Sequence, residues 1–157
     1  MITTKEILCQ EKINIDKGFF SQETHLEDVL FFDIETTGLS PGNSRVFLIG
    51  IIKKDRDDPF PVLLQFLAED NTENEEIALL KAFSAFAQKK KYLVHFNGIS
   101  FDVPYLSHRC RYLGLEQSFS SLCQIDLYRE LTRFPGFFSQ MPDHKQKSYE
   151  NLMGYLR

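Results

Sequence analysis

The sequence predicts one α/β domain, built as a mixed sheet of five strands with helices packed on it. Short apolar, β-prone runs dominate the first half of the chain, and runs with helical spacing alternate with strands in the second half. The length of 157 residues is the usual size of one domain. An apolar fraction of 43% and a charged fraction of 25% are typical of globular domains, which excludes disordered and fibrous classes.

Three strands are expected first. Val29 to Ile34 is a β-prone run that ends before a turn rich in Gly and Pro at residues 38–43. The runs from Val46 to Lys53 and from Pro61 to Leu67 flank a charged stretch at residues 54–59, which predicts an antiparallel hairpin.

Helices and strands then alternate. Thr72 and Glu75 form a capping box ahead of apolar residues at helical spacing, which predicts a helix that ends near Ala87. A second helix is expected around Pro104, with Gly114 behind its end. The remaining expected elements are a fourth strand from Tyr92 to Phe96, a fifth from Leu122 to Ile125, a helical piece from about Asp126, a loop from Arg133 to Lys147 and a last helical turn capped by Ser148.

Composition narrows the class of protein. The first 26 residues lack clean periodicity, so we expect an N-terminal extension over 1–26 and the domain over 27–157. The longest apolar run has seven residues, too few to span a bilayer, and no secretory signal is visible. Three cysteines without a Cys-x-x-Cys pair favour a reducing cytoplasm. A net charge of −4 argues against coating nucleic acid by bulk positive charge.

Two carboxylates share one face of the first expected strand. Asp33 and Glu35 are two residues apart, whereas Phe32 and Ile34 point to the other face. Close like charges raise each other's pKa, and a divalent cation would offset their repulsion. The pair therefore favours Mg²⁺ or Mn²⁺, which bind through a few acids and a substrate phosphate. The alternative is that these acids only end a strand and open a turn.

A third acid follows the fourth expected strand. Asp102 lies where that strand meets the second helix, and the carboxyl ends of strands are where open α/β sheets bind ligands. If the first and fourth strands are parallel neighbours, Asp102 approaches Asp33 and Glu35 and completes a cluster of three acids. The alternative role of Asp102 is that of a helix N-cap.

Other polar and aromatic residues allow two interpretations. His95 is expected to be a structural histidine rather than a catalytic one. Asn97 and Phe101 either shape the turn before the second helix or contact a substrate. Tyr105, Arg109 and Tyr112 form a polar stripe on that helix, which we interpret as an exposed face, with phosphate contact and base stacking as the alternative.

The two acidic motifs carry a family resemblance. The segments D-I-E-T-T-G-L and N-G-I-S-F-D-V-P-Y-L resemble the first two exonuclease motifs of the DEDD (DnaQ-like) superfamily. Their surroundings are most similar to bacterial ribonuclease-H-like proteins of the YprB type, from about Leu26 to Gly154. The resemblance implies a ribonuclease-H-like fold, with three antiparallel strands first, then parallel strands, and helices on both faces of the sheet.

The resemblance also implies an activity. Asp33, Glu35 and Asp102 would be the catalytic acids and the ligands of two Mg²⁺ or Mn²⁺ ions in a 3′→5′ exonuclease, which removes terminal nucleotides from single-stranded DNA or RNA. Thr36, Thr37 and Leu39 would hold the terminal nucleotide, and Leu39 would wedge against its base.

One part of the family pattern is missing. The superfamily has a fourth acid, preceded by a Tyr or His, and no residue of this sequence matches it. We therefore expect a domain truncated before its third motif, with weakened metal binding and turnover. Asp126 resembles an acid near the site in the family, and the alternative is that it caps the next helix. Competing functions are a catalytically silent module that binds nucleic acid or protein and, third, a phosphatase of small molecules.

Overall fold

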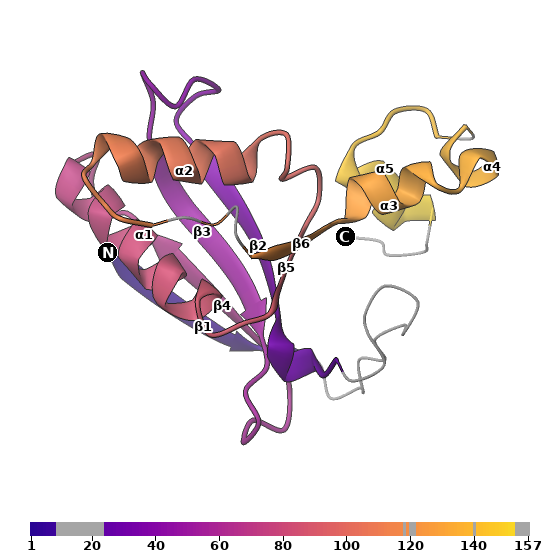
Figure 1. The fold of residues 1–157 in the computed structure, drawn as a ribbon, viewed down its shortest axis with the longest axis horizontal. Helices are drawn as coiled ribbons and strands as arrows, with labels where there is room; N and C mark the ends of the chain where they lie inside the picture. The colour runs from indigo at the N-terminus through magenta and orange to yellow at the C-terminus, as the bar shows by residue number, and fades with distance from the viewer. Residues whose placement is uncertain (9–23, 118, 120–121, 140, 153–157) are drawn as a thin grey trace.

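The computed structural model describes residues 1–8, 24–117, 119, 122–139 and 141–152. A six-stranded sheet in the order β1-β4-β3-β2-β5-β6 lies at its centre (Figure 1). The strands are β1 Ile2–Ile7, β2 Val29–Thr36, β3 Val46–Lys53, β4 Val62–Leu67, β5 Tyr92–His95 and β6 Cys123–Asp126. The helices are α1 Glu73–Ala87, α2 Asp102–Tyr112, α3 Leu127–Thr132, α4 Pro135–Phe138 and α5 Gln146–Leu152, with a 3₁₀ turn at Leu26–Asp28.

The sheet has an antiparallel and a parallel half, as the sequence predicted. β2, β3 and β4 pair antiparallel in chain order, with Asp33 opposite Gly50. β5 pairs parallel to β2, with Phe31 opposite Val94, and β6 pairs parallel to β5. The first and fourth expected strands are therefore parallel neighbours, and their carboxyl ends meet at one edge.

A sixth strand comes from the segment that the sequence analysis treated as an extension. β1 pairs antiparallel with β4, from Ile2 opposite Leu67 to Ile7 opposite Val62. All six of its side chains are exposed, so no apolar alternation marks this strand in the sequence. Its pairing rests on the backbone ladder. The rest of the expected extension, residues 9–23, lies outside the described residues.

The helices begin close to the expected points, with two corrections. Thr72 caps α1 by accepting a hydrogen bond from the Glu75 N–H at 3.3 Å. The expected loop from Arg133 to Lys147 contains the short helix α4. Ser148 is not a cap, because α5 already begins at Gln146 and the Ser148 hydroxyl donates to Asp143 at 2.6 Å.

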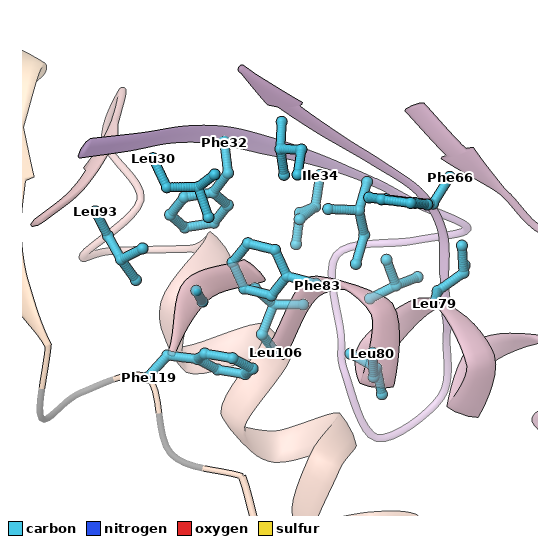
Figure 2. Packing of buried hydrophobic residues seen from close by; sticks show 14 of the residues in the cluster. Leu30, Phe32, Ile34, Phe66, Leu79, Leu80, Phe83, Leu93, Leu106 and Phe119 are labelled. Atoms are coloured by element: carbon cyan, nitrogen blue, oxygen red, sulfur yellow. The ribbon is translucent and has the colours of Figure 1, made fainter. Parts of the chain in front are cut away.

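The core lies between one face of the sheet and helices α1 and α2, as Figure 2 shows. Phe32 and Ile34 of β2 point into it, and the Phe32 ring lies 4.9 Å from that of Phe83 on α1. α3, α4 and α5 gather beyond β6 (Figure 1). The other face of β2 carries Asp33 and Glu35 toward its carboxyl end, and nearer its start Val29 and Phe31 pack with Val94 and Ile125 in a second, smaller cluster. None of the helices in the described part of the chain combines the length and apolar character needed to cross a bilayer.

Candidate active site

The alternation of β2 presents two acids on the face opposite the core. Asp33 and Glu35 line a hollow of about 500 Å³ on this face. Phe31 shares their side of the strand and forms part of the same wall. The shared face predicted from the spacing of the two acids is confirmed.

Burial and repulsion act on Asp33. The side chain reaches solvent through the hollow, yet the surrounding walls remove enough water to raise the pKa of its carboxyl. The negative charge of Glu35 raises this pKa further, and a backbone hydrogen bond from Ile34 opposes the rise. Asp33 therefore lies where a positive charge would be stabilised.

Asp102 is the more strongly perturbed acid. It is the first residue of α2 and only 5% exposed. Burial, and next the charge of Asp33, raise its pKa to about 6, although backbone hydrogen bonds, one of them from Ile34, favour the charged form. The parallel pairing of β2 and β5 thus brings Asp102 within electrostatic reach of Asp33.

The three acids interact in pairs rather than as a closed trio. Asp33 repels Glu35, and Asp33 repels Asp102. Within the described ranges, no three His, Cys, Asp or Glu side chains lie close enough together to hold a metal ion as they stand. No lysine or arginine of the described residues forms an ion pair with any of the three acids. Three unpaired carboxylates are nevertheless the hard oxygen donors that Mg²⁺ and Mn²⁺ prefer.

Asp126 shapes the turn that leads to Asp102. Its carboxylate accepts from the Asn97 N–H at 2.7 Å and the Ile99 N–H at 3.3 Å, and from Tyr128 N–H at 3.1 Å as the N-cap of α3. Asn97 has a φ of 60°, a left-handed conformation that Asn tolerates well. The capping alternative is therefore confirmed for Asp126, and Asn97 takes the turn-shaping role through its backbone.

His95 is a structural histidine, as the sequence predicted. Its Nδ1 accepts from the Gly98 N–H at 3.1 Å, so the proton belongs on Nε2, which lies 3.2 Å from Gln124 Oε1. Burial lowers the pKa of its imidazole, although Asp126 opposes this. Both ring nitrogens are thus occupied within the fold, Nδ1 by the turn before α2 and Nε2 by Gln124 on β6.

Gly98 leaves room for that ring. A Cβ at this position would lie 2.6 Å from the His95 ring and 3.1 Å from Asp102 Oδ2. We predict that Gly98→Ala lowers the free energy of unfolding by about 1–3 kcal/mol, because the ring must move. Urea unfolding checks this, with Gly42→Ala as the matched control, since nothing lies within 4 Å of a Cβ there. Equal losses in the two variants would contradict the prediction.

The residues expected to hold a terminal nucleotide lie in and before the β2–β3 loop, residues 37–45. Thr36 Oγ1 donates to the Gly38 carbonyl at 3.0 Å, and Thr37 Oγ1 accepts from the Arg45 N–H at 3.0 Å. Leu39 is 86% exposed. The hydroxyls of the two threonines thus form hydrogen bonds within the loop, whereas the apolar side chain of Leu39 is exposed to solvent. The ring of Phe101 packs at 5.3 Å from Tyr105, beside the core.

The expectation of an exposed polar stripe on α2 is confirmed for Tyr112 and wrong for Tyr105 and Arg109. Tyr105 and Arg109 are each 2% exposed, whereas Tyr112 is 59% exposed. The Arg109 guanidinium binds both carboxylate oxygens of Glu76 on α1, at 2.8 and 2.6 Å. Arg109 is therefore occupied within the fold and is not free to contact phosphate.

Sequence reasoning missed several residues of the site. Phe31, Phe96 and Gln146 line the hollow beside Asp33. The parity of Phe31 with Asp33 along β2 would have indicated its position. Gln146 comes from a distant segment, and no local pattern marks it.

The raised pKa of Asp102 predicts a pH dependence of stability. Between pH about 4 and about 6 the folded state keeps a proton that the unfolded chain releases. This retained proton favours the folded state. Its contribution to the free energy of unfolding is full below the pKa of Asp102 in the unfolded chain and is lost as the pH rises through about 6. The loss is at most about 3 kcal/mol, since a tenfold change in proton affinity corresponds to about 1.4 kcal/mol.

The comparison with Asp102→Asn isolates this effect, because His95, with its lowered pKa, contributes the opposite trend in both proteins. Urea unfolding in EDTA at several pH values measures the free energy of unfolding of both proteins. The value for Asp102→Asn should rise relative to that of the unaltered chain as the pH rises from 4 to 7. Parallel profiles would contradict the prediction.

A family model described as the RNase_H superfamily matches residues 30–155. A search of curated proteins gives no match. Two similar solved structures are a family B DNA polymerase from the archaeon Pyrobaculum calidifontis and E. coli Exonuclease I in complex with an oligonucleotide.

These likenesses concern the fold. The polymerase is 23% identical with a TM-score of 0.53, over 81% of this chain and 22% of that one. Exonuclease I is 13% identical with a TM-score of 0.56, over 78% of this chain and 35% of that one. The chain thus spans only a minor part of either solved chain, and both share its arrangement of strands and helices.

Proposed function

This chain belongs to the RNase H (RNase_H) superfamily, and we propose that it is a metal-dependent 3′→5′ exonuclease domain acting on single-stranded DNA or RNA. One observation supports the proposal most: Asp102 is buried and faces the charge of Asp33, with no cationic partner among the described residues. Buried like charges are costly, and a bound cation would offset their repulsion. The likeness in fold to Exonuclease I, whose complex contains an oligonucleotide, favours a nucleic acid as substrate.

Asp33, Glu35 and Asp102 would hold Mg²⁺ or Mn²⁺. In the structure Asp33 interacts with Glu35 and with Asp102 in separate pairs. To hold the cations together, the three side chains would have to rotate toward one another. A two-ion site supplies an activated water and stabilises the leaving 3′-oxygen. The chain's own contribution is to fix Asp102 through the turn that Asp126 and His95 hold.

Leu39 and the hollow would receive the substrate. Leu39 lies in the loop that follows Glu35 and presents an exposed apolar side chain to the last base. Phe31 and Phe96, which line the hollow, offer rings on which bases stack.

The test uses a single-stranded oligonucleotide labelled at its 3′ end. The chain is supplied in excess over the strand with Mn²⁺ or with EDTA, so that a single turnover is visible. We expect release of the 3′-terminal nucleotide in Mn²⁺ alone. A strand that binds equally in Mn²⁺ and EDTA and stays whole would overturn the proposal and identify the silent binding module.

A further inference from the structure

The β2–β3 loop is closed by its own hydrogen bonds. The Thr37 N–H donates to the Arg45 carbonyl at 2.9 Å, and the Arg45 N–H returns a bond to Thr37 Oγ1 at 3.0 Å. The Ser44 hydroxyl lies 3.0 Å from the Gly38 carbonyl and also contacts that of Ser40. These bonds tie residues 37–45 together, so contacts that hold any part of the loop also bear on the position of Leu39.

Helix α2 anchors the loop from outside. The Tyr105 hydroxyl lies 3.2 Å from the Gly38 carbonyl and 3.0 Å from Ser44 Oγ. The Arg109 guanidinium donates to the Pro41 carbonyl at 3.0 Å. In Figure 1 this loop extends past α2 at the top of the view. Asp102 is three residues before Tyr105, so one face of α2 carries both an acid of the site and the anchors of the loop.

Glu76 on α1 completes the anchor. It binds Arg109 through both carboxylate oxygens, and its Oε1 also accepts from the Val46 N–H, the first residue of β3, at 3.0 Å. The side chains of Arg109 and Glu76 are 3% and 1% exposed. A buried ion pair is a poor source of stability, but it fixes groups in one arrangement. The loop is thus held at its start, at its tip and at its exit into β3.

We infer that Tyr105, Arg109 and Glu76 are positioning residues that set the distance between Leu39 and the acids of the site. The inference rests on the proposed function. A strand can then enter only until its last base meets Leu39, which places the terminal phosphodiester at Asp33 and its neighbours. Because every base can make an apolar contact, the Leu39 side chain would recognise a free strand end without selecting a particular base.

The test compares three variants of the full chain. Tyr105→Phe removes one hydroxyl and keeps the ring. Leu39→Ala removes the contact itself. Tyr112→Phe is the matched control, because it removes an exposed hydroxyl from the same helix and keeps the ring that lies 4.6 Å from the Arg109 guanidinium. The probe is a single-stranded oligonucleotide with 2-aminopurine as its last 3′ base and a phosphorothioate terminal linkage that resists cleavage. A second strand carries the 2-aminopurine in its interior.

Two readouts are measured in Mn²⁺. In Tyr105→Phe, hydrogen exchange of the Thr37 and Arg45 amides should quicken about fivefold to tenfold, which corresponds to one lost hydrogen bond. Exchange of the Ile49 and Ile51 amides in β3 should stay unchanged. The fluorescence of the terminal 2-aminopurine bound to Tyr105→Phe should fall to the level seen with Leu39→Ala. The affinity of Tyr105→Phe for the strand should change less than about threefold. Tyr112→Phe should match the unaltered chain in every measurement.

Each other outcome is decisive. Unchanged exchange in the loop of Tyr105→Phe overturns the anchoring. Faster exchange with an unchanged terminal signal overturns the link between the anchors and the strand end. If the unaltered chain binds neither strand, the proposed function fails, and the inference about the substrate fails with it. If the unaltered chain binds and the Tyr105→Phe signal is intact, only the inference fails.

Discussion

Asp33→Asn is expected to abolish the Mn²⁺-dependent release of 3′-terminal nucleotides, lowering its rate at least about a thousandfold. The amide keeps the size and one oxygen of the carboxylate but removes the negative charge that balances a divalent cation. It also removes the repulsion that raises the pKa of Asp102, so the fold should be at least as stable as before. Single-turnover digestion of a 3′-labelled strand measures the rate.

Asp57→Asn is the matched control, because it changes the net charge equally at an exposed residue of the β3–β4 connection. It should digest the strand at the rate of the unaltered chain. Calorimetric titration with Mn²⁺ should show that only Asp33→Asn loses binding. A digestion rate for Asp33→Asn within tenfold of that of the control would show that Asp33 is not a catalytic residue.

Arg109→Met is expected to lower the free energy of unfolding by about 3–5 kcal/mol, the second large effect. The replacement leaves Glu76 charged in a site where its side chain is 1% exposed. It also leaves the Pro41 carbonyl without its donor. Urea unfolding at neutral pH measures the loss.

Two further variants separate burial from charge. Arg109→Met combined with Glu76→Gln should recover much of the loss, because no unpaired buried charge remains and the amide oxygen can still accept from the Val46 N–H. Lys91→Met breaks the exposed pair with Asp28 and should cost less than about 1 kcal/mol. A loss for Arg109→Met as small as that for Lys91→Met would contradict the prediction.

The strands and the two acidic motifs could be predicted because their signals are local. The alternation of Phe32, Asp33, Ile34 and Glu35 fixes which side chains face the core, and β2 has that pattern. The strand-to-helix boundary before Asp102 placed it at the correct edge of the sheet once β5 paired with β2. The fold and the faces of these acids thus follow from short stretches of sequence.

The anchors of the loop could not be predicted, because their partners are distant along the chain. Tyr105 and Arg109 have the spacing of any polar helix stripe, and their burial depends on Glu76, which lies 33 residues from Arg109. β1 escaped prediction because an exposed edge strand needs only backbone pairing, which leaves no apolar pattern. The parts that the sequence hides are those decided by contacts between separate elements.

Diffraction from crystals soaked in Mn²⁺, recorded at the manganese absorption edge, most directly tests whether Asp33, Glu35 and Asp102 hold a cation together. We predict an anomalous peak within about 2.6 Å of carboxylate oxygens from all three residues, the range of hard cations and their oxygen ligands. Manganese bound only elsewhere, or a peak that one of the three acids does not touch, would contradict a shared metal site.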